Sequence, residues 1–101
     1  MEDLINQVIF WGKQHNIDNP QRQALKVTEE WGETIEEFNH ERLGEEFKDG
    51  IGDTLVSLII FADIMGVDIK ESLAKSLDTI QNRKGITSDG NFIREDYGNE
   101  K

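Results

Sequence analysis

The chain has 101 residues and a mass of 11.6 kDa, which is enough for one small hydrophobic core and too short for two independent ones. Its 21 acidic and 11 basic residues give a formal net charge of −10, so direct binding to nucleic acid or to an anionic membrane surface is not expected. The absence of cysteine excludes disulfides, thiolate metal sites and thiol nucleophiles. The longest apolar run, residues 58–62, is far shorter than a membrane span, and no signal-like segment opens the sequence, so we expect a cytoplasmic protein.

Apolar residues recur at helical spacing in the first half of the chain and predict two helices. The first spans residues 2–15, and the second spans residues 21–43 after Pro20, whose fixed φ suits the start of a helix. The apolar stripe of the first helix consists of Leu4, Ile5, Val8 and Trp11. The apolar positions of the second follow steps of three and four and are Ala24, Val27, Trp31, Ile35 and Phe38.

The second half of the chain predicts two more helices, over residues 45–65 and 68–83, separated by Gly66 as a C-terminal stop. In residues 84–101 turn residues alternate with short apolar stretches, which indicates either a short hairpin or an extended arm. We therefore expect one all-α domain over residues 1–101, a four-helix bundle with a short C-terminal arm or hairpin. Because one small core cannot bury all of the apolar helix faces, we also expect a homodimer or a homotetramer.

Acidic residues are concentrated between residues 29 and 53, where ten acids stand against two bases. On the second predicted helix, Glu30 and Glu33 are three residues apart and Glu29 and Glu33 are four apart, so their side chains are neighbours. On the third, Asp49 and Asp53 repeat this spacing. If the two helices form an antiparallel hairpin, these carboxylates converge on one site.

Close carboxylates beside an apolar helix segment either hold protons or bind a hard cation through their oxygens, and Mg²⁺ suits a site that also receives phosphates. The alternative is an acidic face in solvent, which is the usual meaning of an acidic run on a helix. We assign to such a face Glu36, Glu37, Glu41 and Glu45.

Two segments of the chain resemble a known family. Thr28-Glu29-Glu30-Trp31-Gly32-Glu33 and Asp49-Gly50-Ile51-Gly52-Asp53-Thr54-Leu55 are similar to the two acidic helices of MazG-like nucleotide pyrophosphohydrolases, of the all-α nucleoside triphosphate pyrophosphatase superfamily. The resemblance to small phage and bacterial members covers roughly residues 11–96 and includes Asn19-Pro20 and Arg83-Lys84-Gly85. It implies a MazG-like helical bundle that holds Mg²⁺, with Mn²⁺ as a substitute, and cleaves a (d)NTP to the monophosphate and pyrophosphate.

The resemblance also assigns metal ligands. Glu30 and Glu33 match the Glu-x-x-Glu of the family, and Asp53 matches the aspartate of its Glu-x-x-Asp. Gly50 stands where the second motif has its glutamate, which leaves Asp49, with Glu46 as the alternative, to supply the missing oxygen.

Other residues are assigned to catalysis and to substrate binding. A carboxylate not fully engaged by metal can take a proton from the attacking water, which makes Glu33 and Glu29 the candidate catalytic residues. The candidate cations for phosphate oxygens are Lys26, Arg83 and Lys84. Trp11 is a candidate for stacking on a base, although an aromatic residue at helical spacing is more often part of a core.

Two other functions stay open at this stage. The first is a pyrophosphohydrolase for another nucleotide, such as phosphoribosyl-ATP or an alarmone, which uses the same metal chemistry. The second is a non-enzymatic helical protein whose acidic surface mimics DNA or binds a basic partner, and Gly50 in place of a ligand favours it.

Overall fold

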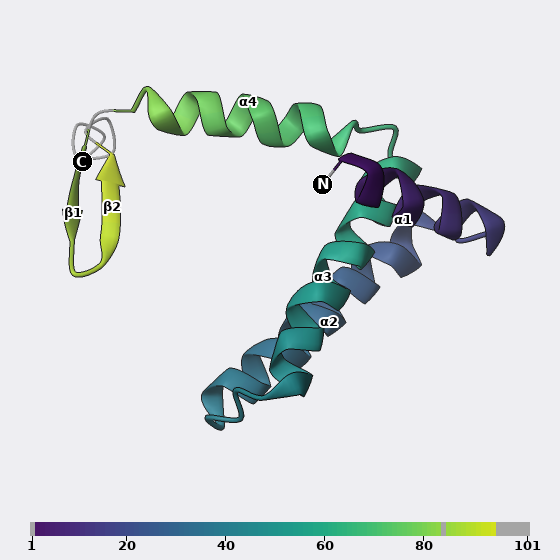
Figure 1. Cartoon of the computed structure of the whole chain (residues 1–101), viewed down its shortest axis with the longest axis horizontal. Coiled ribbons are helices and arrows are strands. Elements are labelled where there is room, and N and C mark those ends of the chain that lie inside the picture. Colours follow the sequence, from purple (N-terminus) through teal and green to yellow (C-terminus); the bar gives the residue numbers. More distant parts are fainter. Residues whose placement is uncertain (1, 84, 95–101) are drawn as a thin grey trace. The chain divides into compact units, whose positions relative to one another are not determined.

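A computed structural model describes residues 2–83 and 85–94 (Figure 1). The described residues contain four helices, α1 (Glu2–Gln14), α2 (Pro20–Asn39), α3 (Glu45–Ile64) and α4 (Ile69–Gln81), followed by two strands, β1 (Gly85–Ser88) and β2 (Asn91–Arg94). The four predicted helices are therefore confirmed, and of the two alternatives for the last segment the structure has the hairpin. The chain divides after Ile69 into two compact units, which are described separately below.

Three of the helices end in the same way. A residue of positive φ follows the helix, and the backbone N–H groups of this residue and of the next one donate to carbonyl oxygens of the last helical turn. These residues are Asn16 (φ 56°) after α1, Glu41 (φ 58°) after α2 and Gly66 (φ 70°) after α3. After α2, for example, Glu41 N–H donates to Phe38 O at 3.0 Å and Arg42 N–H donates to Glu37 O at 2.9 Å, which is the Schellman arrangement.

The end of α2 differs from the prediction. The sequence predicts a helix up to residue 43, whereas α2 ends at Asn39. The residue with left-handed backbone after α2 is Glu41, and glutamate rarely adopts this conformation. The glycine that usually marks a helix end in the sequence is therefore absent here. The start of α2 follows the prediction more closely, because Asn19 Oδ1 accepts a hydrogen bond from Arg22 N–H at 2.9 Å and Pro20 is the first helical residue.

In the first unit α2 and α3 lie side by side, and α1 packs against α3 (Figure 1). The buried apolar residues of this unit are Ile5, Ile59, Ile60 and Ala62. Gly12 of α1 approaches Ile60 so closely that an added Cβ would lie 3.2 Å from its Cγ1. The core therefore lies at the C-terminal half of α3, beside α1.

Polar groups are buried where α2 meets α3. Gln23 Nε2 donates to the backbone oxygen of Ser57 at 3.1 Å, across the two helices. The Ser57 hydroxyl donates to Asp53 O at 2.8 Å, so each of these two buried side chains makes a hydrogen bond to the backbone. This interface is consequently more polar than the core beside α1.

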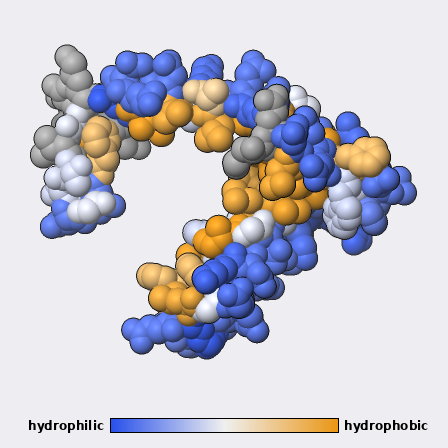
Figure 2. All heavy atoms as spheres, in the orientation of Figure 1, coloured by the Kyte–Doolittle hydropathy of each residue, from blue (hydrophilic) through white to orange (hydrophobic). Residues whose placement is uncertain are grey.

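Much of the predicted apolar surface of the first unit is exposed. Trp31 and Phe38, placed on the inner stripe of α2 by their spacing, are 48% and 56% exposed, and Leu55 of α3 is 47% exposed. Figure 2 shows uncovered apolar surface on these helices next to their hydrophilic surface. Helical spacing thus predicted which residues share a face but not how completely that face is covered.

The second unit consists of α4 and the hairpin. No residue of α4 is buried, and its apolar residues Leu73, Leu77 and Ile80 are each more than half exposed. The strands pair in antiparallel register with Ser88 opposite Asn91, and the connecting Asp89-Gly90 has positive φ at both residues, as tight hairpins favour. Across the described residues no single helix is long and apolar enough to cross a membrane, while α3 and α4 taken together pass that test despite the break between them.

Candidate functional site

A pocket of about 130 Å³ lies between α2 and α3 and is lined mainly by carboxylates. Both helices contribute residues that repeat along one face, at steps of three and four, as expected for two helices that face each other. The lining residues of α2 are Glu30, Glu33, Thr34 and Glu37, and those of α3 are Glu46, Gly50 and Asp53. Five acidic side chains thus share one small space.

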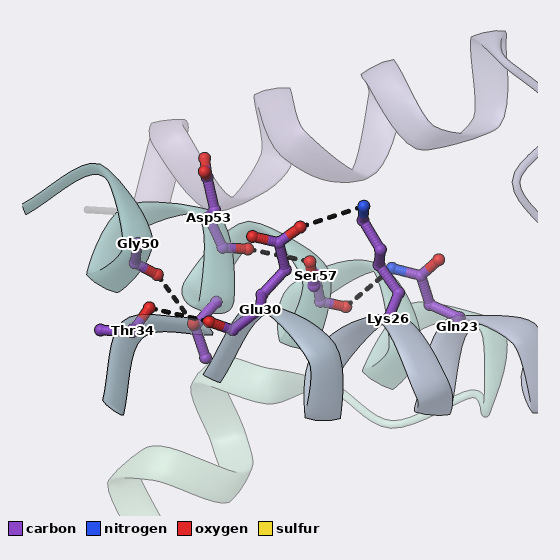
Figure 3. Close-up of polar contacts among 8 residues, drawn as sticks. Gln23, Lys26, Glu30, Thr34, Gly50, Asp53 and Ser57 are labelled. Carbon is purple, nitrogen blue, oxygen red and sulfur yellow. Dashed lines mark hydrogen bonds and ion pairs between the residues drawn. The ribbon is translucent and has the colours of Figure 1, made fainter. Parts of the chain in front are cut away.

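Glu30 is held by Lys26, one turn earlier on the same helix. Lys26 Nζ lies 3.0 Å from Glu30 Oε1, and the Glu30 side chain is only 15% exposed (Figure 3). The hydrogen bond and the charge of Glu30 raise the pKa of Lys26 above its ordinary value, and the nearby Glu29 and Glu33 add to this effect. Lys26 therefore stays charged beside the pocket.

Glu37 is held in a similar way by Arg42, which follows the end of α2. Arg42 Nε lies 2.9 Å from Glu37 Oε2 and its second nitrogen lies 3.1 Å from Oε1, so the guanidinium binds both carboxylate oxygens. These hydrogen bonds and the Arg42 charge lower the pKa of Glu37. Glu37 is consequently a charged, paired residue of the pocket. The sequence analysis assigned it to an acidic face in solvent, and that prediction was wrong.

The remaining carboxylates of the pocket are Glu33, Glu46 and Asp53. Among residues 2–83 and 85–94, no ion pair joins any of these three to a basic side chain. Carboxylate oxygens from two facing helices are the donors that a hard cation such as Mg²⁺ prefers, so the donor set fits such an ion. In that same part of the chain no three acidic or histidine side chains close around one point in metal geometry, so these side chains would have to turn inward to bind an ion.

The family comparison bears directly on this pocket. A family model for the MazG nucleotide pyrophosphohydrolase domain matches residues 18–86, more than half of the chain. The chain belongs to the MazG family. The MazG match begins just before α2 and ends in β1, so every residue of the carboxylate pocket lies inside it and α1 lies outside it. Comparisons with curated proteins and with solved structures gave no match.

The MazG pocket brings together part of the predicted metal site. Glu30, Glu33 and Asp53 line it, whereas Asp49 and Glu29 are not among its lining residues. Glu46, the alternative to Asp49, does line the pocket. The structure thus groups three of the four predicted ligands with Glu46.

The predicted substrate-binding residues of this MazG domain occupy different places. Lys26 is beside the pocket, as described above. Trp11 is 48% exposed, stacks on His15 with ring centroids 4.3 Å apart, and lines a separate apolar groove with Val56 of α3. Arg83 is exposed and belongs to the second unit, and Lys84 lies outside the described residues.

The sequence analysis did not assign Thr34 or Glu37 to the site of the MazG domain, and it named Glu46 only as an alternative ligand, yet all three line the pocket. A signal for them exists in the spacing. Counting from Glu30, the face of α2 repeats at 33, 34 and 37, and counting back from Asp53, the face of α3 repeats at 50 and 46. Extending the two acidic motifs by one turn on the same face would have found the whole lining.

Proposed function

We propose that this chain is a Mg²⁺-dependent nucleotide pyrophosphohydrolase that cleaves a nucleoside or deoxynucleoside triphosphate to the monophosphate and pyrophosphate. The observation that carries the proposal is a pocket lined by five carboxylates from α2 and α3, inside the segment that matches the MazG domain. A triphosphate and a protein of net charge −10 repel each other, so a cation has to mediate between them.

In this proposal Glu30, Glu33 and Asp53 hold the cation, and Glu46 or Asp49 supplies a further oxygen. Mg²⁺ held there would neutralise the charge of the phosphates and would make a nearby water easier to deprotonate. Glu33, or Glu29 beside it, accepts the proton of the water that attacks the α-phosphorus. The bond from that phosphorus to the bridging oxygen breaks, and pyrophosphate leaves.

The cationic residues have the role of binding phosphate oxygens. Lys26 is one turn from the pocket and charged at neutral pH, so it can exchange its bond to Glu30 for one to a phosphate. Arg83 and Lys84 are the further candidates on the chain. Trp11 is the candidate for a contact with the base, because its ring is half exposed.

A panel of NTPs and dNTPs with Mg²⁺ tests the proposal, with products resolved into monophosphate plus pyrophosphate or diphosphate plus phosphate. We expect the first pair of products, and we expect Glu33→Ala to lower kcat by a factor of about 10² or more, because the general base and a ligand are lost together. Glu36→Ala is the matched control, since Glu36 is an exposed acid of α2 outside the pocket. Turnover of phosphoribosyl-ATP or an alarmone alone would keep the chemistry and change the substrate. Absence of both turnover and cation binding would reject the proposal in favour of an acidic binding protein.

A second pair of variants decides the fourth ligand. Glu46→Ala removes a carboxylate that lines the pocket, whereas Asp49→Ala removes one that does not. We expect Glu46→Ala to weaken Mn²⁺ binding about tenfold or more, and Asp49→Ala to leave it within about twofold of wild type. The opposite order would return the role to Asp49.

A further inference from the structure

The floor of the carboxylate pocket is a contact between Thr34 of α2 and Gly50 of α3 (Figure 3). Thr34 is 1% exposed and is the largest side chain that the described structure buries completely. Its hydroxyl donates to Glu30 O at 2.8 Å, so it is buried without an unsatisfied donor. The two helices therefore approach each other at this point with no room between them.

Gly50 permits this approach because it has no side chain. A Cβ added at residue 50 would overlap the Thr34 hydroxyl and would lie 3.1 Å from Thr34 Cβ and 3.3 Å from its Cγ2. Thr34 cannot easily turn away, because its hydroxyl is held by Glu30 O. Any larger residue at position 50 must therefore push α2 and α3 apart. The same contact leaves no space for the glutamate that the resemblance expected there.

The contact lies in the middle of the carboxylates. On α2, Glu30 and Glu37 are one turn to either side of Thr34, and on α3, Glu46 and Asp53 are one turn to either side of Gly50. The separation of the two helices at the floor consequently sets the distance between the carboxylates of α2 and those of α3.

We propose that Thr34 and Gly50 are a positioning pair: their contact holds the carboxylates of α2 and α3 at the separation needed to bind a divalent cation. This inference rests on the proposed function and adds residues that themselves contribute no ligand. On this inference the site requires glycine at position 50, and Gly50 is not simply a lost ligand.

The test compares two glycines of the same helix. Gly50→Ala adds a methyl group that meets Thr34, whereas Gly52→Ala, two residues later, adds one that meets nothing within 4 Å. With Mn²⁺ as the probe, followed by the EPR signal of the free ion at a temperature where circular dichroism shows each variant folded, we expect Gly50→Ala to weaken binding about tenfold or more. We expect Gly52→Ala to bind as wild type does and to have a higher Tm, because alanine favours the helix.

Two double variants separate positioning from a general loss of stability. Thr34→Ala combined with Gly50→Ala removes the obstructing hydroxyl and should restore Mn²⁺ affinity to within about threefold of Thr34→Ala alone. Thr34→Ser combined with Gly50→Ala keeps the hydroxyl and should not restore it. A merely structural role would lower Tm in Gly50→Ala without changing Mn²⁺ affinity, and either that result or equal rescue by both double variants would overturn the inference.

The outcomes also distinguish this inference from the proposed function. If the wild-type chain binds no Mn²⁺ and hydrolyses no nucleotide, the proposed function fails and the positioning role fails with it. If the wild type binds Mn²⁺ and Gly50→Ala binds it equally well, the function stands and only the positioning role is overturned.

Discussion

The α2–α3 pair and α4 all carry apolar residues at helical spacing, but they differ in how far those helices are covered. Along α2 and α3 both apolar and polar residues are buried, among them Ile60, Thr34 and Ser57. In α4 no residue is buried, and Leu77 at the centre of its apolar stripe is 51% exposed. Periodicity is a property of one helix, whereas burial depends on a partner, so the pattern alone predicts the first and not the second.

The largest effect expected from this difference is on stability. Ile60 is 4% exposed, so Ile60→Ala should lower the free energy of unfolding by about 2–5 kcal/mol, measured by urea denaturation. Leu77→Ala, the matched change on α4, should cost less than about 1 kcal/mol because half of its side chain is already in solvent. Equal losses would contradict the comparison and would mean that the stripe of α4 is covered. Light scattering of the same samples would then show whether a second copy of the chain covers it.

The same contrast explains how much of the fold could be predicted. The existence of the four helices follows from local signals: apolar stripes, Asn19-Pro20 before α2 and Gly66 after α3. The predicted end of α2 was wrong because Glu41 adopts the left-handed backbone, which a glutamate rarely does. A local rule fails there because the Schellman hydrogen bonds, and the pair of Arg42 with Glu37, stabilise that turn.

The residues of the candidate site also differ in whether the sequence alone could indicate them. Glu30, Glu33 and Asp53 carry a motif, so the sequence could indicate them, and the structure places them in one pocket. Thr34 carries no motif, and Gly50 stands out in the sequence only as a departure from one, because their part in the pocket is a contact between two helices that only the packing reveals. A residue that acts by being small, or by filling the space beside a small residue, gives almost no signal in a single sequence.

A smaller effect is expected on the charged side of α2. Lys26→Gln should raise KM for the triphosphate about 3–10-fold with kcat little changed, because one charge-assisted bond to phosphate is lost from both the ground state and the transition state. Lys75→Gln on α4 is the matched control and should leave KM unchanged, since Lys75 is exposed on the other unit. An equal rise in KM for both would mean that overall charge, and not the position of Lys26, sets the affinity.

The raised pKa of Lys26 gives the sign of a pH effect in the same assay. A lysine whose pKa is raised in the folded state contributes stability that is complete below its ordinary value of 10.5 and is lost as pH rises through the higher folded value. Lys26 is therefore fully charged throughout the neutral range. The KM difference between wild type and Lys26→Gln should accordingly stay constant there, and a difference that changes near neutral pH would assign it to another group.

The smallest effect concerns Arg42, and it tests whether the turn after α2 depends on the ion pair. Arg42→Gln should lower Tm by a few degrees at most near neutral pH, because an exposed ion pair contributes little. The pair lowers the pKa of Glu37, so its contribution is present above the ordinary value of 4.5 and is lost as pH falls through the lower folded value. The Tm difference between wild type and Arg42→Gln, measured by differential scanning calorimetry, should therefore vanish in acid. Glu37→Gln should give the same difference at neutral pH and add nothing to Arg42→Gln. A difference that persists in acid would mean that the Arg42 side chain stabilises the turn in some way other than its pair with the Glu37 carboxylate, because Arg42→Gln keeps the backbone N–H that donates to Glu37 O.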